Sequence, residues 1–196
     1  MKNDFIKCFI MYLVLFLINV PAQAAETFTL DPKHTYVLWN IQHFGFSTQT
    51  GKWYIDHGTL TLDKDNPKNS KVNVTIKVGD VATGLQELDN HLKGKLFFDV
   101  DHFPTATFVS NRVDVINKNT AKVMGTLTLH GASKPVVLDV TLNKVGTSPV
   151  TDKMTVGFSA STTLKRSDFG INALLPGLAD EVKINIEAES YKPNGP

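Results

Sequence analysis

Residues 71–78 read Lys-Val-Asn-Val-Thr-Ile-Lys-Val, a complete alternation of polar and apolar side chains. Successive side chains of a β-strand point to opposite faces, so Val72, Val74, Ile76 and Val78 share one face. A strand with one apolar and one polar face is typical of an antiparallel sheet that covers an interior on one side only. This segment therefore predicts a half-buried antiparallel strand.

Similar alternation recurs along most of the chain. A short lead-in at Phe28–Leu30 is followed by longer candidate strands at Thr35–Phe44, Lys52–Leu62, Thr105–Asn111, Ala121–His130, Val136–Lys144, Met154–Lys165 and Glu181–Ser190. Their connections are mostly of hairpin length, with Ser47–Gly51 and Gly131–Pro135 among the expected linkers, so neighbouring strands should pair antiparallel. Closing the sheet removes the exposed edges of such strands. The pattern predicts an all-β fold, an antiparallel β-barrel of about eight strands.

One segment departs from the strand pattern. Thr83–Lys95 carries Leu85, Leu88 and Leu92 at spacings of three and four, which indicates a short amphipathic helix. Thr83 is a candidate N-cap, with Gln86 three residues later completing a capping box. We therefore expect a short helical insertion in the barrel.

Residues 1–24 differ in kind from the rest of the chain. Lys2 and Lys7 precede an apolar run, and the stretch ends in Ala-Gln-Ala at residues 22–24. A basic start, a short apolar centre and small residues at the end are typical of a cleavable secretory signal peptide. We expect residues 1–24 to be this peptide, residues 25–196 to form one domain, and the protein to reside in the periplasm. The single cysteine, Cys8, would be removed with the peptide.

Charge and motif content weaken several classes of function. Residues 25–196 contain equal numbers of basic and acidic side chains and no basic stripe, which argues against a nucleic-acid partner. The six histidines show no metal-ligand spacing, so we expect no metal site. Neither a nucleophile motif nor a phosphate-binding loop is present, so we expect no catalytic residues and no enzyme.

Two strands carry a charged or polar residue on their apolar face. In Thr35–Phe44 this face ends in His43, and in Met154–Lys165 it continues to Arg166. His43 is either a hydrogen-bonded core residue or a ligand contact at the mouth of the barrel. Arg166 is paired, with Asp168 as the candidate partner, or hydrated at a rim, or in contact with an anionic ligand, because an unpaired buried guanidinium costs several kcal/mol. The inward-facing candidates for a ligand site are Val37, Trp39, Ile41, His43, Val74, Ile76, Phe108, Leu127, Phe158, Ala160, Leu164, Arg166 and Ile184.

The stretch 167–180 is loop-like but holds Ile171, Leu174, Leu175 and Leu178. It can be interpreted as a plug on one end of the barrel. The alternative is a mobile lid or a loop that touches a membrane.

Several short motifs occur in a defined order along the chain. They are Asp-Pro-Lys-His-Thr at 31–35, Ile-Gln-His-Phe-Gly at 41–45, Asp-Asn-His-Leu-Lys at 89–93, Phe-Phe-Asp at 97–99, Phe-Pro-Thr-Ala-Thr-Phe at 103–108, Gly-Thr-Leu-Thr-Leu-His-Gly at 125–131, Lys-Pro-Val at 134–136, Arg-Ser-Asp-Phe-Gly at 166–170 and Glu-Val-Lys-Ile at 181–184. Together they resemble the YceI-like polyisoprenoid-binding family from Phe28 to about Glu189. The resemblance implies a lipocalin-like barrel, an exported protein, and a long lipid in an elongated apolar pocket. An arginine often precedes the Asp-x-His-Leu motif of this family, where this sequence has Leu88. That departure implies a neutral lipid head group or reliance on Arg166.

These observations lead to one main hypothesis, the periplasmic binding, storage or transport of a long-chain isoprenoid or similar lipid. No cofactor is expected, but an isoprenoid, quinone-like or fatty-acid-derived lipid is expected as ligand. A transient membrane contact and a homodimer are left open. The alternatives are a stress-responsive scaffold or interaction protein with a filled barrel and no cargo, and an enzyme acting on a lipid head group.

Overall fold

The computed structural model describes residues 25–193, and the expected signal peptide lies outside these residues. Most of this part of the chain is β-strand, with one short α-helix. No helix within residues 25–193 has the length and apolar character needed to cross a membrane.

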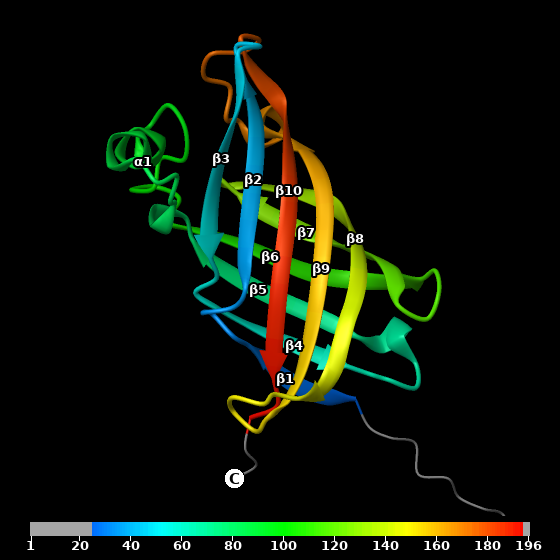
Figure 1. Ribbon diagram of the computed structural model, residues 1–196. Coiled ribbons are helices and arrows are strands. Elements are labelled where there is room, and N and C mark those ends of the chain that lie inside the picture. Colours follow the sequence, from blue (N-terminus) through cyan, green and yellow to red (C-terminus); the bar gives the residue numbers. More distant parts are fainter. Residues whose placement is uncertain (1–24, 194–196) are drawn as a thin grey trace, which may run out of the picture.

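Eight strands of the described chain form a closed antiparallel ring in the order β1-β4-β5-β6-β7-β8-β9-β10, and β10 pairs back onto β1 (Figure 1). Their bounds are β1 Glu26–Leu30, β4 His57–Leu62, β5 Lys71–Lys77, β6 Thr105–Val115, β7 Thr120–Leu129, β8 Ala132–Thr147, β9 Met154–Lys165 and β10 Leu178–Tyr191. The predicted barrel of about eight strands is confirmed.

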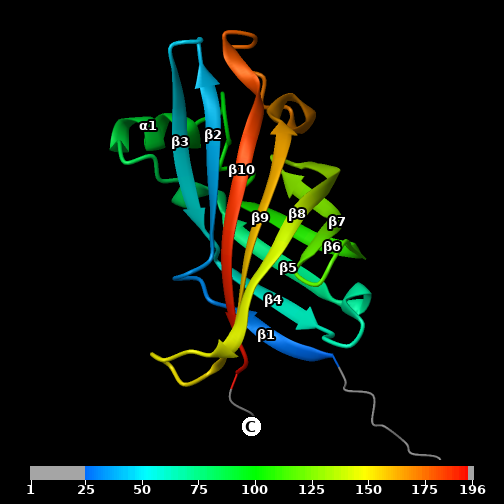
Figure 2. The ribbon, with the colours of Figure 1, turned by 45° about the vertical axis from the view of Figure 1, so that its right-hand side comes forward.

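Two further strands extend the ring at one end. β2 (Tyr36–His43) pairs with β10 along the part of that strand that β1 leaves free, and β3 (Ser47–Tyr54) pairs with β2. The hairpin therefore runs beside β10 from Leu178 to Glu187 and projects past the ring, as Figure 2 shows. An isolated bridge between Lys52 and Ala82 ties β3 to the segment after β5.

The single strand expected at Lys52–Leu62 is wrong. The chain breaks at Ile55 and Asp56, which separates β3 from β4. The residues expected as a linker, Ser47–Gly51, belong to β3, because Thr50 and Gln42 form side-chain hydrogen bonds across the β2–β3 pair. The connection is reduced to residues 44–46, with Phe44 and Gly45 at positive φ.

The other expected linker, Gly131–Pro135, is also shorter than predicted. Strand β8 begins at Ala132, so the turn consists of His130 and Gly131 alone. Both residues have positive φ, 50° and 75°. This conformation gives the two-residue turn whose twist matches that of the strands it joins.

The helical insertion is present as α1 (Gln86–Lys93), flanked by the 3₁₀ turn η2 (Val78–Asp80). The predicted capping box is wrong, because the N-cap position is Leu85 and has no side-chain cap. Thr83 instead donates through its backbone N–H and its hydroxyl to Asp89 Oδ1, both at 2.7 Å. Asp89 therefore anchors the segment that enters the helix.

Candidate functional site

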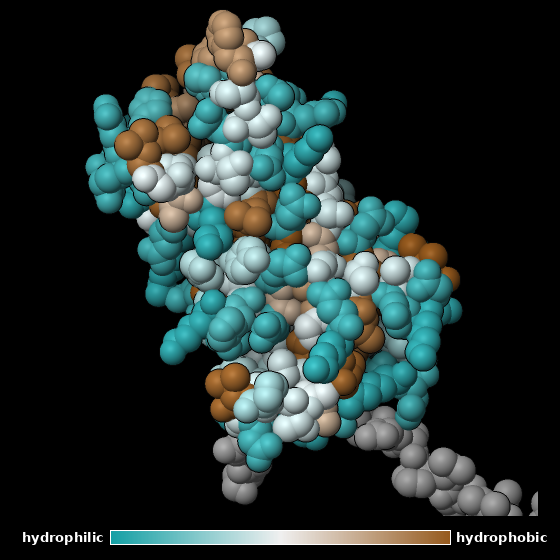
Figure 3. Space-filling model, in the orientation of Figure 1, coloured by the Kyte–Doolittle hydropathy of each residue, from teal (hydrophilic) through white to brown (hydrophobic). Residues whose placement is uncertain are grey.

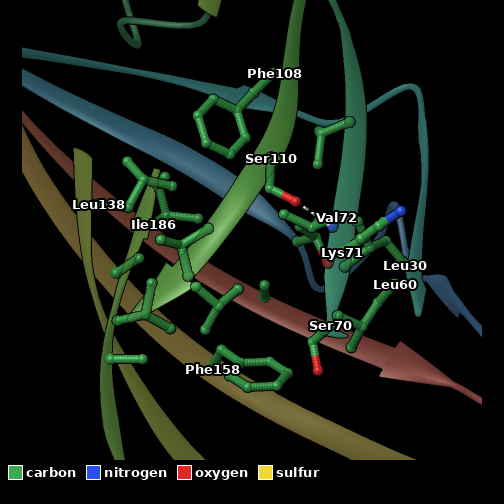
Figure 4. A pocket seen from close by; sticks show the side chains of 18 of the residues that line it. Leu30, Leu60, Ser70, Lys71, Val72, Phe108, Ser110, Leu138, Phe158 and Ile186 are labelled. Carbon is green, nitrogen blue, oxygen red and sulfur yellow. Dashed lines mark hydrogen bonds between the residues drawn. The ribbon is translucent and has the colours of Figure 1, made fainter. Parts of the chain in front are cut away.

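The interior of the barrel is hollow. A cavity of about 430 Å³ runs between the strands and is lined almost entirely by apolar side chains (Figure 4). All eight barrel strands contribute, including Leu60 from β4, Val72 from β5, Leu138 from β8 and Ile186 from β10. The alternation seen in the sequence creates this lining, because every second residue of a barrel strand points inward.

Two β-bulges keep the lining apolar where the strict alternation in sequence is lost. In β6 the inward-facing residues have even numbers up to Ser110. After the bulge, the odd-numbered Val113 and Val115 line the cavity instead. A register shift in β8 between Leu142 and Lys144 turns Val145 inward in the same way. One extra residue in a strand moves the following side chains to the other face, so the bulges restore apolar residues to the interior.

Gly125 makes room for the aromatic ring of Phe108. An added Cβ at Gly125 would lie 2.5 Å from Cζ of Phe108 and 2.6 Å from the carbonyl oxygen of Val109. The Phe108 ring lies over Gly125 and also lines the cavity. The glycine therefore permits an aromatic ring in a sheet wall without a clash.

The hydroxyl groups of two lining residues are already engaged by the protein. Ser110 Oγ accepts a hydrogen bond from the backbone N–H of Val72 at 2.8 Å, as Figure 4 shows. Thr35 Oγ1 donates to the carbonyl of Glu189 at 3.0 Å. The middle of the cavity therefore favours an apolar occupant.

One end of the cavity is its polar mouth. It is bordered by the β4–β5 connection, which holds Lys64, Pro67 and the 3₁₀ turn η1 (Pro67–Asn69), and by the β6–β7 turn at residues 116–119. The backbone N–H of Leu142 donates to the carbonyl of Asn119 at 2.7 Å, which holds this turn against β8. Charged and amide side chains thus meet at this end.

The opposite end is closed by a second packed layer. One buried cluster lies there, drawn from β2, α1, the start of β10 and the segments around residues 81, 97 and 171. Its members are Trp39, Ile41, Val81, Leu92, Phe97, Ile171 and Leu178. Trp53 lies between this cluster and the cavity. Its ring makes an edge contact with Phe98 at 5.1 Å between centroids, and its Nε1 donates to the carbonyl of Val78. The cavity is therefore blind at this end.

Arg166 belongs to the closed end and not to the cavity. It is 7% exposed and lies in the 3₁₀ turn η3 (Arg166–Phe169). Its guanidinium donates to three backbone carbonyls, those of Ala179, Ile171 and Leu178, at 2.8–2.9 Å. Burial lowers the pKa of Arg166, and the charge of Asp180 opposes that shift. The expected ion pair with Asp168 is wrong. The guanidinium instead donates to these three carbonyls and lies near the charge of Asp180.

Asp180 completes this anchor. It accepts hydrogen bonds from the backbone N–H of Ser167 at 2.9 Å and from the Ser167 hydroxyl at 2.8 Å. The backbone bond is the largest cause that lowers the pKa of Asp180. With Ile171 and Leu178 buried below it, the loop 167–180 is held as a plug, in line with the first of the two interpretations.

His43 also lies away from the cavity. It is exposed at the end of β2, where its ring makes an edge contact with Phe44 at 4.7 Å between centroids. The backbone N–H of Phe44 donates to the carbonyl of Gly177, which ties the hairpin to the plug. The position expected to mark the mouth of the barrel is therefore at the opposite end from the mouth.

Nine of the thirteen expected ligand-site residues line the cavity, namely Val37, Val74, Ile76, Phe108, Leu127, Phe158, Ala160, Leu164 and Ile184. The structure places Trp39, Ile41, His43 and Arg166 elsewhere, because β2 and β9 run past the blind end of the cavity. Contact of any of these residues with a ligand stays a prediction.

The expected set omits the residues of the mouth. Alternation could have added Val140 and Ile186, which share the inward phase of their strands. No sequence signal placed Lys64, Pro67 or the turn at 117–119 beside the cavity, because these residues meet only after the barrel closes.

The structure defines a class of protein, the closed antiparallel β-barrel with an apolar internal cavity, one open end and one plugged end. The YceI-like domain model matches residues 28–190, and the chain belongs to the YceI-like family. It is 37% identical over 174 residues to a UPF0312 protein of Pseudomonas putida, an alignment covering 87% of this chain and 88% of the relative. A UPF0312 protein of Photorhabdus laumondii is 34% identical over 178 residues, covering 90% and 92%.

Solved structures share the fold. The Campylobacter jejuni YceI protein superimposes with a TM-score of 0.66 at 31% identity, covering 78% of this chain and 90% of that one. Burkholderia cenocepacia BcnA gives a TM-score of 0.73 at 24% identity, covering 82% and 98%. A polyisoprenoid binding domain from Saccharophagus degradans, implicated in plant cell wall breakdown, gives 0.65 at 12% identity, covering 85% and 98%.

Proposed function

We propose that this protein binds a long apolar lipid chain inside the barrel, with the tail toward the blind end and the head group at the mouth. The observation that carries the proposal is the hollow apolar cavity whose charged and amide groups lie at one end. The fold is shared with a domain described as polyisoprenoid-binding, which makes an isoprenoid the first ligand class to examine.

The size of the cavity sets the length of tail that fits. A methylene group occupies about as much space as a water molecule in the liquid, ~30 Å³. A cavity of about 430 Å³ therefore holds a tail of about 14 carbons, or roughly three isoprene units. At ~0.8 kcal/mol per methylene, burial of such a tail contributes about 11 kcal/mol before the losses that accompany binding. The tail would dominate affinity.

The proposed orientation differs from the one expected from sequence. Lys64, Lys118 and the amides of Asn117 and Asn119 lie at the mouth, whereas His43 and Arg166 lie at the other end. The head group would accordingly meet the mouth residues. We propose no chemical step, because the side chains that line the cavity are mostly apolar.

The alternative of a scaffold with a filled barrel conflicts with the cavity. Side chains of a solid barrel would occupy the interior at close packing. Here the inward residues leave a cavity of about 430 Å³. We further propose that binding serves periplasmic storage or transport of the lipid, and cell fractionation with an antibody would test that location.

Native mass spectrometry tests the binding proposal. Protein purified from its own cells should carry an adduct with the mass of a long-chain lipid, and delipidated protein should regain one when isoprenoids and fatty-acid derivatives are offered. Repeated absence of any adduct in both preparations would refute the proposal.

A further inference from the structure

Exposed apolar side chains gather beside the mouth of the cavity. Val115 and Ile116, at the end of β6 and in the following turn, are 42% and 59% exposed, and Val145 of β8 is 41% exposed. Val115 and Val145 also line the cavity, so the apolar wall continues through the mouth onto the outer surface. Figure 3 shows brown side chains at the right-hand edge of the molecule, where Figure 1 places the β6–β7 turn.

Lysines are frequent in the segments that border the mouth. The three segments that border the mouth, residues 63–71, 115–120 and 142–147, contain five lysines and two aspartates, whereas charges balance over residues 25–196. Within the described chain, Lys64 is the only one of these lysines with an acidic partner, Glu26 at 3.6 Å. Asp63 is held by hydrogen bonds from the backbone of Asn66 and the side-chain amide of Asn69, which lower its pKa. This rim therefore combines exposed apolar side chains with an excess of lysines.

A long lipid needs a route that avoids water. Each methylene group lowers the free aqueous concentration of a lipid about fourfold. For a tail of about 14 carbons this amounts to roughly eight orders of magnitude. Exchange through free solution would be very slow, so the mouth has to meet the surface from which the lipid leaves.

We infer that the mouth rim, defined as Val115, Ile116 and Val145 with Lys64, Lys68, Lys71, Lys118 and Lys144, docks onto the surface of a bilayer that contains anionic lipids. The apolar residues would enter the interface while the lysines meet anionic head groups, a combination that favours reversible surface binding. This inference rests on the proposed lipid binding, because the cavity opens within the rim.

The opposite tip offers a competing surface. Phe46 is 90% exposed and Leu174 is 57% exposed, close to the β2–β3 hairpin and the plug. Neither residue borders the cavity, and the blind-end cluster separates this tip from the interior. A lipid delivered there would face a packed wall, so the observations favour the rim.

Paired substitutions distinguish the two surfaces. Ile116→Asp places a charge at the rim, and Phe46→Asp places one at the opposite tip as a matched control. Flotation with phosphatidylcholine vesicles, with and without phosphatidylglycerol, measures docking in the absence of cargo. We expect wild type and Phe46→Asp to float with phosphatidylglycerol vesicles, and Ile116→Asp to bind them about tenfold more weakly. Lys118→Glu should weaken binding at least about fivefold, the order expected for one basic residue near an anionic surface.

Transfer of a fluorescent fatty acid from the same vesicles gives the second readout. Ile116→Asp should slow transfer about tenfold, yet bind the probe delivered from ethanol within twofold of wild type. Equal flotation and transfer of Ile116→Asp and wild type would overturn the docking inference, and losses confined to Phe46→Asp would assign docking to the tip. Absence of probe binding by wild type, together with absence of any lipid adduct in native mass spectrometry, would refute the proposed function instead, and flotation would still decide the docking surface.

Discussion

Ala160→Phe tests whether a lipid tail occupies the barrel. Ala160 lies in the middle of β9, lines the cavity, and pairs with Val140 and Ile186 of the neighbouring strands. The substitution adds six carbon atoms to the interior, which we expect to displace about four methylene groups of a bound tail. At ~0.8 kcal/mol each, about 3 kcal/mol of binding free energy is lost, or over a hundredfold in affinity for a long tail.

The effect should depend on the length of the ligand. Affinity of the wild type for straight-chain alcohols should rise with each added carbon and level off at about 14 carbons, the capacity worked from the cavity. Ala160→Phe should level off about four carbons earlier, while its affinity for short alcohols changes little. Displacement of a fluorescent fatty acid measures both curves.

Ser161→Phe is the matched control, because Ser161 is the exposed neighbour of Ala160 on the outer face of β9. It adds an aromatic ring to the same strand and should leave the chain-length curve unchanged. Circular dichroism and urea unfolding establish that both variants fold. Identical curves for Ala160→Phe and wild type would refute the reasoning, since a tail bound inside the barrel has to sense the added ring.

The plugged end provides the remaining predictions. Arg166→Met leaves three buried carbonyls without their donor and should lower the free energy of unfolding by about 3–5 kcal/mol in urea titrations, whereas Asp168→Asn should change it by less than about 0.5 kcal/mol. His43→Ala should bind the fluorescent fatty acid within twofold of wild type, because His43 lies beyond the blind end; a large loss of affinity would contradict the orientation proposed for the ligand. Asp180 has a lowered pKa in the folded state, so its contribution to stability is present above the ordinary aspartate pKa and is lost as the pH falls through the folded value. Asp180→Asn should therefore lose less unfolding free energy than wild type between neutral and strongly acidic pH. Urea midpoints measured at both pH values check this. Equal losses in the two proteins would contradict a stabilising role for the hydrogen bonds between Ser167 and ionised Asp180.

Local alternation predicted the strands well where each strand has one apolar face. β5, β7 and β9 begin and end within two residues of the predicted segments, since strict alternation in sequence leaves only one face to bury. The prediction failed at β3, whose polar residues resemble a linker. Ser47–Gly51 forms a strand because β2 offers partners for its backbone and side chains, and this information lies in another part of the chain.

The candidate site was likewise predictable in part from local sequence and depended in part on distant regions of the chain. The sequence alone determined an antiparallel barrel and most of its apolar wall, because the two-residue period of a strand assigns each side chain to a face. Only the tertiary structure decided which end opens. The two-residue period placed His43 and Arg166 on the inward faces of their strands. It carried no information about their positions along the barrel axis. Strand register and the bulges in β6 and β8 fix such positions, and they bring Lys64 and Asn117 to the mouth while three loop carbonyls enclose Arg166 at the opposite end.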